Sequence, residues 1–340
     1  MNEPEASARP SDHLLTLLNG YRVSQALHVA ATLGIADLLA GGPLASAELA
    51  ERTGSHPGSL YRLLRALADA GVLAEHLGQR FGLTATGEAL RSDAPDSLAG
   101  MARFIGRPYI WQAWSGLLHS VQTGENAFAH LNGESLWAYW AQRPEENRIF
   151  DAAMTGNTRR AQHALLERTD FGRYGTVIDV GGGRGTLLIA LLQKFPDLKG
   201  VLFDQPQVVA HAGPLLTEAG LAERCRVVSG SFFEGVPPGG GAYLLKAVLH
   251  DWDDEQAIQI LQRCHEAMAP GASLLVIERR MDQGVRDRHA SLSDLNMLVG
   301  PGGRERTTAE FRTLFEHAGF TLTDIRDAGY GFSIIEGVPV

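Results

Sequence analysis

The sequence predicts a two-part protein, with a helical first half and a second half of α/β class built on a largely parallel sheet. Two observations predict this division. Up to about residue 165, apolar residues recur at the three- and four-residue spacing of amphipathic helices. Beyond it, short runs rich in Val, Ile and Leu alternate with helical segments, which is the pattern of repeated strand–helix units.

Composition restricts the function before any motif is considered. The 340 residues are enough for two domains, and the net charge of −9 argues against sequence-independent binding to nucleic acid or to an anionic membrane. The two cysteines, Cys225 and Cys264, are too few for a disulfide framework or a four-cysteine zinc site. Because no apolar run is long enough to span a bilayer and the polar amino terminus is unlike a secretory signal, we expect a cytoplasmic protein.

The chain is expected to begin with a disordered tail, residues 1–12, which precedes a compact domain at 13–98. Helical spacing covers residues 12–41 until Gly41-Gly42-Pro43 breaks it. Ser46 is a suitable amino-terminal cap for the next helix, because its hydroxyl can accept a hydrogen bond from the first turn.

A winged helix is predicted in the remainder of this domain. A helix marked by Leu60–Leu67 ends near Gly71, and two short strands, 72–74 and 80–83, surround a turn at Gly78. Winged helices can bind DNA, but acidic residues outnumber basic ones over this stretch, so few phosphate contacts are available. We therefore expect a packing and dimerisation module, with a DNA-binding regulator as the alternative.

Residues 99–165 continue as helices that are rich in large side chains and that join the two halves. Most of these side chains are expected in the core, and a few could line a pocket for a flat ligand. They include Phe104, Tyr109, Trp111, Trp114, Trp137, Tyr139, Trp140, Phe150 and Met154.

The second half, residues 166–340, alternates strands and helices. Strands are predicted at 176–180, 199–203, 226–228, 242–247, 273–278, 320–325 and 332–336. Helices are predicted at 187–195, 208–219, 255–268 and 309–318. Repeated strand–helix units give a parallel sheet covered by helices, and the last two strands form an antiparallel edge.

A glycine-rich turn follows the first of these strands and opens the first helix. It reads Asp179-Val180-Gly181-Gly182-Gly183-Arg184-Gly185, and its glycines allow a sharp turn and the close approach of a ligand. Such turns hold NAD, FAD or S-adenosylmethionine (SAM), so the turn alone leaves the ligand open. The carboxylate of Asp179 would repel a pyrophosphate but would suit the ammonium or sulfonium group of SAM.

Two further positions extend this candidate cofactor site. Asp204 and Gln205 follow the second strand, where an acid can accept hydrogen bonds from ribose hydroxyls; a helix cap is the alternative role of Asp204. After the third strand stand Ser231, Phe232 and Phe233, where a nucleotide-binding sheet meets the adenine. Phe232 is expected to cover one face of that ring, with core packing as the alternative.

With Leu244-Leu245-Lys246-Ala247-Val248-Leu249-His250-Asp251-Trp252, these motifs closely resemble those of the SAM-dependent small-molecule O-methyltransferases. This is the caffeic-acid and isoflavone type, which includes bacterial antibiotic-tailoring enzymes. The resemblance covers nearly the whole chain and rests on the ordered set DVGGGxG, an acid, GxFF, LKxxLHDW and GGxERT. It implies an amino-terminal winged-helix dimerisation domain followed by a Rossmann-like SAM domain. It therefore also implies a homodimer.

The resemblance also implies which residues hold the cofactor. Gly181, Asp204, Phe232 and Lys246 would bind SAM, and Trp252 would flank its adenine. One position departs from the family, because Ser231 stands where an aspartate is usual. Its hydroxyl can form a hydrogen bond but carries no charge, so the nucleoside is expected to be bound more weakly at this position.

His250 is the candidate general base, since it follows the fourth strand at the edge of the sheet where ligands bind. Methyl transfer to a hydroxyl needs a base and alignment, and an imidazole with a pKa near 6.5 suits the first task. By resemblance, Glu278 and Glu305 flank the base and orient it. Asp251 is expected instead in the acidic first turn of the next helix, with Asp253 and Asp254 as neighbours.

The acceptor side is less defined. By resemblance, Phe150, Met154, Asn296 and Met297 line the pocket, together with Asp294, although the chain is one residue shorter than the plant type between Met297 and Gly302. No cluster of carboxylates and histidines stands at metal-ligand spacing in the sequence, so no metal is expected.

Together these features predict an enzyme that transfers a methyl group from SAM to a hydroxyl of an aromatic secondary metabolite, such as a polyketide, a phenazine or a phenol. S-adenosylhomocysteine (SAH) would be the second product. An N-methyltransferase on the same scaffold is the alternative, because a neutral nitrogen acceptor would not need His250 as a base.

Overall fold

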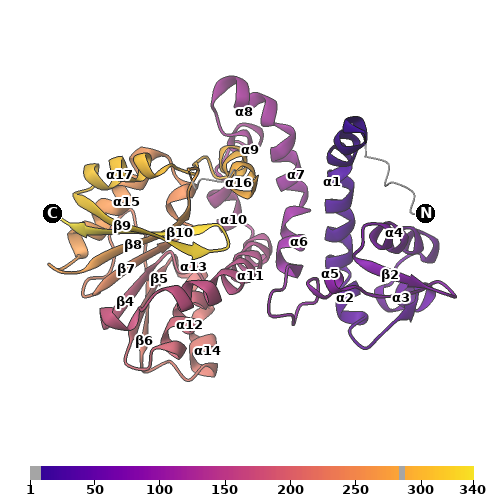
Figure 1. The fold of residues 1–340 in the computed structure, drawn as a ribbon, viewed down its shortest axis with the longest axis horizontal. Coiled ribbons are helices and arrows are strands. Elements are labelled where there is room, and N and C mark those ends of the chain that lie inside the picture. Colours follow the sequence, from indigo (N-terminus) through magenta and orange to yellow (C-terminus); the bar gives the residue numbers. More distant parts are fainter. Residues whose placement is uncertain (1–8, 283–287) are drawn as a thin grey trace, which may run out of the picture. The chain divides into compact units, whose positions relative to one another are not determined.

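The computed structural model describes residues 9–282 and 288–340, and these form two compact units (Figure 1). The first unit contains the described residues up to Pro108 together with Ala152–Gly156. The second contains Tyr109–Asp151 and Asn157–Val340. Among the described residues, no helix combines the length and apolar character that crossing a bilayer requires.

The first unit is mainly helical. Its elements are α1 (Pro10–Thr32), α2 (Ile35–Leu38), β1 (Leu44–Ala45), α3 (Ser46–Thr53), α4 (Pro57–Asp69), β2 (Leu73–His76), β3 (Arg80–Leu83), α5 (Ala85–Glu88) and α6 (Ala99–Ile105). The strands form a small antiparallel sheet in the order β1-β3-β2, and β2 and β3 are the predicted hairpin. With α3 and α4 they confirm the winged helix, which closes around the buried side chains of Leu49, Leu64 and Phe81.

Two local predictions in this unit are wrong. The helix predicted over residues 12–41 is interrupted at Gly34, whose φ of 66° is left-handed and accessible to glycine without a Cβ penalty. Ser46 does not cap α3, because the cap is Ala45 and the Ser46 hydroxyl instead lies 3.5 Å from Oε1 of Gln79.

Five helices join the two halves of the chain. They are α7 (Pro108–Ser115), α8 (Leu117–Thr123), α9 (Ala127–Asn132), α10 (Leu136–Ala141) and α11 (Pro144–Arg168). Asn126 and Ser135 cap α9 and α10 with their side-chain oxygens, which explains why these short helices begin where they do.

The second unit is built on a seven-stranded sheet with the order β6-β5-β4-β7-β8-β10-β9. Its strands are β4 (Thr176–Val180), β5 (Lys199–Asp204), β6 (Cys225–Ser229), β7 (Ala242–Lys246), β8 (Ser273–Arg279), β9 (Phe320–Gly329) and β10 (Phe332–Pro339). The first five are parallel, whereas β10 is antiparallel to both β8 and β9. The predicted parallel sheet with an antiparallel edge is therefore confirmed.

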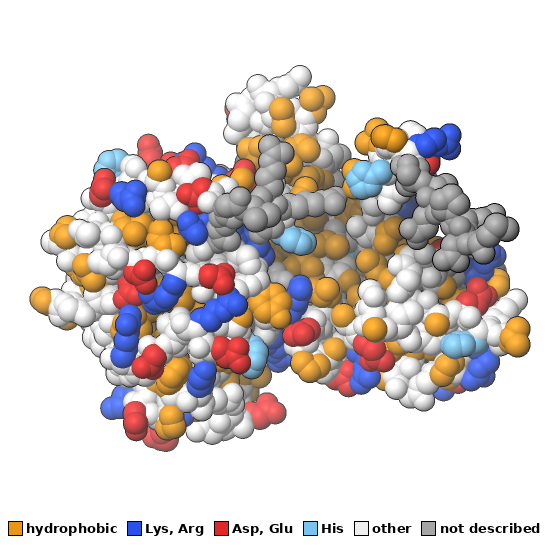
Figure 2. Space-filling model, in the orientation of Figure 1, with side chains coloured by type: hydrophobic (Ala, Val, Ile, Leu, Met, Phe, Trp, Pro, Cys, Tyr) orange, Lys and Arg blue, Asp and Glu red, His pale blue; other side chains and the backbone are white. Residues whose placement is uncertain are grey.

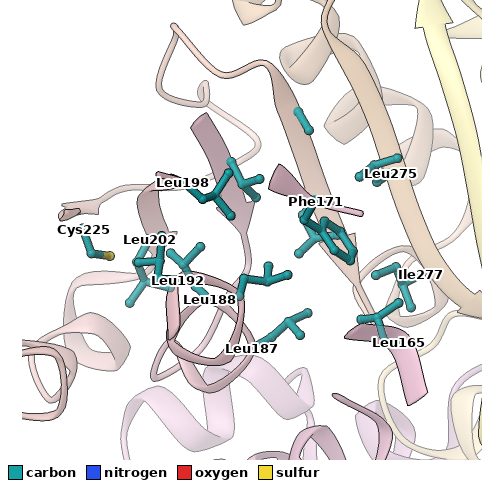
Figure 3. Close-up of a cluster of buried hydrophobic side chains, with 14 of the residues drawn as sticks. Leu165, Phe171, Leu187, Leu188, Leu192, Leu198, Leu202, Cys225, Leu275 and Ile277 are labelled. Atoms are coloured by element: carbon teal, nitrogen blue, oxygen red, sulfur yellow. The ribbon is translucent and has the colours of Figure 1, made fainter. Parts of the chain in front are cut away.

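Helices cover both faces of this sheet. The helical elements are η1 (Gly172–Tyr174), α12 (Thr186–Lys194), α13 (Pro206–Val209), α14 (Ala212–Glu218), η2 (Leu249–Asp251), α15 (Asp254–Ala267), α16 (Arg288–Val299) and α17 (Thr308–His317). One face packs on α12 and α14, as Figure 3 shows for Leu188, Leu192 and Leu202. The other face packs on α15 and α17. Since alternate strand residues point to opposite faces, the central strands β4, β7 and β8 are apolar over most of their length, whereas the edge strand β9 carries exposed polar residues.

Two features of this unit differ from the sequence prediction. The helix predicted over residues 208–219 is two short helices, α13 and α14, separated at Ala210 and His211. The helix α16 was not predicted; its apolar residues follow no clear amphipathic pattern.

The strand order reverses between β4 and β7, since β5 continues from one side of β4 and β7 lies on the other. In open parallel sheets, ligands bind outside the carboxyl ends of the strands at such a point. The glycine-rich turn follows β4 and the His250 segment follows β7, so both candidate motifs lie at this edge.

Candidate active site

The glycine-rich turn has a backbone that only glycines suit. Gly181, Gly183 and Gly185 have φ values of 72°, 62° and 81°, in the left-handed region. A Cβ on Gly182 would lie 2.5 Å from Cδ1 of Leu202, so this residue is closed to larger side chains by packing. The turn therefore presents bare backbone at the start of α12, where a ligand can approach closely.

Two carboxylates border this turn. Asp204 accepts hydrogen bonds from the backbone N–H of Gly183 at 2.8 Å and of Gln205 at 2.7 Å, which fixes its side chain beside the turn. It does not cap the following helix, whose cap is Gln205. Asp179 is buried, its Oδ2 has no hydrogen-bond partner among the described residues, and burial raises its pKa to about 7.

An orphaned buried carboxylate oxygen needs a proton or a cationic donor. The ammonium group of SAM is such a donor, and the bare backbone of the turn and the fixed carboxylate of Asp204 are groups that suit a nucleoside. The chemistry of the residues present therefore fits SAM.

Aromatic rings gather beside the turn. The ring centroids of Phe232 and Phe233 lie 5.0 Å apart, and those of Phe233 and Trp252 lie 4.8 Å apart, both edge to face. Trp252 also stacks on Trp137, with centroids 5.6 Å apart and planes inclined by 17°. These rings form an apolar wall of the kind that a flat base packs against. From the sequence, Trp137 could not be distinguished from the large core residues of the segment 99–165.

Two other predicted cofactor residues have protein partners in the structure. Lys246, at the end of β7, donates to Oγ1 of Thr158 at 3.3 Å, and burial lowers its pKa to about 8. The Ser231 hydroxyl accepts from the backbone N–H of Phe233 at 3.3 Å, so it shapes the turn that carries the phenylalanines.

The candidate base lies on η2, directly after β7. Nδ1 of His250 is 3.0 Å from Oε1 of Glu305, within hydrogen-bond distance. The same Glu305 oxygen accepts from the Ser293 hydroxyl at 2.7 Å, and Asp294 accepts from the Glu305 backbone N–H at 2.9 Å. Glu305 is therefore held from α16, and its carboxylate contacts the imidazole of His250.

Glu278 hydrogen-bonds to the backbone of the His250 segment rather than to the imidazole ring. Its Oε1 accepts backbone N–H groups from Val248 and Leu249, both at 2.9 Å, and from His250 at 3.4 Å. Its Oε2 lies 3.6 Å from Nδ1 of His250, beyond hydrogen-bond distance. Glu278 thus holds the backbone of the segment and acts on the imidazole mainly through its charge.

Asp251 does not lie in the first turn of the next helix, and that prediction is wrong. It belongs to η2, with Oδ1 3.6 Å from Nε2 of His250, and α15 begins three residues later with Asp253 as its cap. The position on η2 places a third carboxylate beside the imidazole, on the opposite side from Glu305.

The three carboxylates control the charge of the base. Burial by itself would lower the pKa of His250, but Glu278, Asp251 and Glu305 together raise it to about 10. Burial also raises the pKa of Glu278 and raises that of Asp251 to about 7. At Glu305 burial is the largest effect and would raise the pKa, but the hydrogen bond and the charge of His250, together with the Ser293 hydroxyl and the charge of Arg279, hold that pKa below its usual range.

The predicted acceptor residues lie on α11 and α16. Phe150 stacks on Trp140 at 4.0 Å, and Trp140 and Trp137 are edge to face. Met154 belongs to the first unit. Asn296 is half-buried on α16, and Met297 is buried.

The fold assembles clusters of possible metal ligands that the sequence did not reveal. In the described residues, one set is His250, Glu278 and Glu305, and another is His119 with Glu125 and His130. Ligand atoms within each set lie within 4.8 Å of one another. In the first set the side chains are already engaged with each other and with backbone N–H groups, as described above.

Two family models match the chain. One described as an O-methyltransferase domain covers residues 114–321, and one described as an O-methyltransferase dimerisation domain covers residues 15–93. The phenazine O-methyltransferase PhzM of Lysobacter antibioticus is 43% identical over 330 residues, which are 97% of this chain and 96% of the relative. An 8-amino-8-demethylriboflavin N,N-dimethyltransferase of Streptomyces davaonensis is 38% identical over 98% of both chains.

A solved structure extends this similarity to a ligand complex. It is an O-methyltransferase from neocarzinostatin biosynthesis, in complex with SAM and 2-hydroxy-5-methyl naphthoic acid. The TM-score is 0.80 at 36% identity, over 94% of this chain and 96% of that one. The similarity to these proteins includes the dimerisation domain, the glycine-rich turn and the His250 segment. This chain therefore belongs to the SAM-dependent O-methyltransferases.

Proposed function

We propose that His250 is the general base in the transfer of a methyl group to an aromatic hydroxyl. The observation that carries the proposal is the 3.0 Å contact between its Nδ1 and Glu305, at the sheet edge that also carries the glycine-rich turn. Glu305 fixes one ring nitrogen, so Nε2 is left to accept the hydroxyl proton.

The cofactor would be held by residues around the turn. Backbone at Gly181–Gly185, the carboxylates of Asp179 and Asp204, and the rings of Phe232 and Trp252 support this assignment through their positions in the second unit. SAM supplies a methyl group bonded to a positively charged sulfur, which is already a strong electrophile. The protein then has to align the acceptor oxygen and remove its proton.

The proton balance follows from the charges around His250. The neutral imidazole accepts the hydroxyl proton as the oxygen bonds to the methyl carbon and the sulfur–carbon bond breaks, giving a methyl ether and SAH. Glu278, Asp251 and Glu305 would stabilise the resulting imidazolium, and their raising of the pKa of His250 supports this role. The proton is later released to solvent.

We infer that the acceptor is a flat aromatic molecule. The supporting observation is the group of rings formed by Trp137, Trp140, Phe150 and Trp252, which offers stacking surfaces near the base. The named relatives act on a phenazine or, in the solved complex, bind a naphthoic acid. A polycyclic hydroxylated secondary metabolite is the acceptor class that agrees with both.

We infer a homodimer formed through the first unit, which carries the dimerisation-domain match. The supporting feature is the apolar surface of α1. Large side chains on this helix are exposed in the isolated chain, and Figure 2 shows part of this surface at its amino-terminal end. They are Leu14, Leu15, Leu17, Leu18, Tyr21 and Val23. A second copy that covers them would remove this area from water.

The experiment that tests the base compares His250→Ala with the wild type, using mass spectrometry to follow methyl addition to a hydroxylated polycyclic acceptor. Turnover is expected to fall by about 10²–10⁴-fold, while SAH binding measured by calorimetry stays unchanged. His163→Ala is the matched control, because that histidine also pairs with a glutamate but is exposed on α11. It should leave turnover and binding unaltered.

The nitrogen alternative gives a different result. An N-methyltransferase, such as the riboflavin-derivative relative, acts on an amine that needs no prior deprotonation. If His250→Ala methylates an amino acceptor as fast as the wild type does, and the wild type does not methylate the hydroxylated analogue, the proposed reaction is wrong.

Location and nucleic-acid binding stay predictions. The helix α4 would be the one to enter a DNA groove, and its basic residues are Arg62 and Arg65. Two arginines offer few phosphate contacts, so specific DNA binding is not expected. A gel-shift titration at physiological salt checks this point. Cell fractionation checks the predicted cytoplasmic location.

A further inference from the structure

The segment that carries His250 is a short turn held by two buried charged side chains. The turn is η2 (Leu249–Asp251), and it leads directly into Trp252, which belongs to the aromatic wall beside the cofactor turn. The base and the aromatic ring are therefore two residues apart on one piece of backbone. Whatever fixes this backbone fixes both.

One of the two charges is Glu278, which is fully buried and accepts the N–H groups at the start of the turn. The other is Arg306, which is also fully buried. Its Nη1 donates to the carbonyl of Leu249 at 2.9 Å, and its Nη2 donates to the carbonyl of Trp252 at 2.8 Å. The guanidinium thus joins the carbonyl before the base to the carbonyl two residues after it.

The chain around Arg306 lies directly against the turn. A Cβ on Gly303 would be 2.1 Å from the carbonyl oxygen of His250, so only glycine allows this approach. Nε of Arg306 donates to Asp254 at 2.9 Å, at the start of α15. Arg306 also follows Glu305, so one dipeptide supplies both the carboxylate that orients the imidazole and the guanidinium that holds its backbone.

We propose that Arg306 is a positioning residue that sets the base and the adenine-side ring relative to each other. A planar guanidinium can donate to both carbonyls and to Asp254 at once, whereas a lysine ammonium cannot reproduce this fork. Without the fork, the carbonyl of Leu249 keeps the longer hydrogen bond from the Trp252 N–H at 3.3 Å, the carbonyl of Trp252 loses its guanidinium donor, and the turn can then relax. This inference rests on the proposed role of His250 for its effect on turnover but not for its effect on cofactor binding.

The test uses Arg306→Lys, with kcat, the pH profile of kcat/KM and SAH affinity measured on folded protein. A displacement of about 1 Å at the base lowers turnover roughly 10²-fold. Because the same turn carries Trp252, SAH affinity is expected to fall as well, and the pH profile shifts since the distances from His250 to its carboxylates change. His250→Ala, in contrast, loses turnover while keeping SAH affinity.

Arg304→Met is the matched control. Arg304 lies two residues away and donates to the same Asp254 at 3.0 Å, but it is partly exposed, and its other ion pair is with Glu310 rather than with the turn. Its substitution should change neither turnover nor SAH affinity. Equal losses in Arg304→Met and Arg306→Lys would overturn the proposal.

Asp254→Asn is a second variant, for the case that Arg306→Lys fails to fold. It weakens the hold on Arg306 without touching the turn, so smaller losses of both turnover and SAH affinity are expected. A folded variant of either kind with unchanged kcat, pH profile and SAH affinity would overturn the proposal. If His250→Ala retains turnover, the proposed function fails, but SAH affinity still decides the role of Arg306.

Discussion

At the scale of single residues, the chemistry of this site depends on the charge that surrounds one imidazole. Three carboxylates raise the pKa of His250 to about 10, against the desolvation that would lower it. In the ligand-free site the imidazole therefore carries a proton near neutral pH. The proposed base needs the neutral form, so the rate should depend on losing this proton.

The first prediction concerns pH. Because the neutral imidazole becomes more populated as pH rises toward about 10, kcat/KM is expected to increase across the neutral and alkaline range. The measurement is a pH profile of kcat/KM with an acceptor whose own hydroxyl ionises outside this range. A flat profile would contradict the prediction.

The second prediction is that Glu305→Gln moves this rise to lower pH. Loss of one negative charge destabilises the imidazolium, so the pKa of His250 falls, and the amide also orients the ring less strongly. Maximal turnover should fall at the same time. Glu310→Gln is a control for a nearby glutamate, since Glu310 forms the capping box of α17 with Thr307 and accepts from Arg304 rather than from His250. A profile that shifts upward in pH in Glu305→Gln would refute the electrostatic argument.

At the scale of elements, the site is formed by two turns that leave neighbouring strands. The glycine-rich turn follows β4 and the His250 segment follows β7, and these strands are paired at the point where the strand order reverses. Each turn has its shape fixed by packing: the first by Leu202, and the second by Glu278 and Arg306.

The third prediction tests the packing of the first turn with Gly182→Ala. The added Cβ would lie 2.5 Å from Leu202 and 2.6 Å from the Asp179 carboxylate, so the turn has to shift. A loss of about 1–3 kcal/mol in stability is expected from overpacking, together with weaker SAH binding. Thermal unfolding and calorimetry are the measurements.

Gly213→Ala is the control for this substitution, because a Cβ there meets nothing within 4 Å and the residue has no left-handed φ. It should leave SAH binding unchanged and, in α14, raise helix propensity. Tight SAH binding by a stable Gly182→Ala protein would show that the turn tolerates a side chain.

Much of the second unit could be predicted from sequence because its central strands are largely apolar on both faces and are separated by turns that contain glycine. Val177 and Ile178, for example, point to opposite packed layers, so apolar residues follow one another along this strand and its short length identifies it. The glycine-rich turn was predicted with its neighbouring acids for a similar reason, since its chemistry depends on local sequence.

Contacts between distant segments could not be predicted in this way. Asp251 looks like part of an acidic helix start, yet η2 turns it toward His250. Ser293 and Arg306 lie 43 and 56 residues after His250 in the sequence, yet both hold parts of the site. No local pattern around Ser293 indicates this contact. The sequence motif GGxERT was the one signal for Arg306, and it gave no role.

At the scale of the whole molecule, the question is which reactants the enzyme needs besides SAM. The His250 cluster has donor atoms close enough for an ion, but its described hydrogen bonds already pair Glu278 with backbone N–H groups and Glu305 with His250. Methyl transfer from a sulfonium does not require a Lewis acid, because the group that leaves the methyl carbon is a neutral sulfide.

The fourth prediction follows: removal of metal ions by EDTA and dialysis leaves turnover unchanged. The measurement is turnover before and after treatment, with the metal content determined by elemental analysis. Added Zn²⁺ should inhibit, because it would compete with the proton for His250. Loss of activity on chelation that a divalent ion restores would contradict the prediction.

The last prediction concerns assembly and follows from the exposed apolar surface of α1. Leu18 is 65% exposed in the isolated chain, which costs little only if a second copy covers it. Leu18→Glu is therefore expected to convert a dimer into a monomer, as measured by light scattering during gel filtration. Leu77→Glu is the control, since Leu77 is 97% exposed at the β2–β3 turn rather than on α1 and should leave the dimer intact. A monomeric wild type, or a Leu18→Glu protein that stays dimeric, would remove the support that this helix gives to the proposed homodimer.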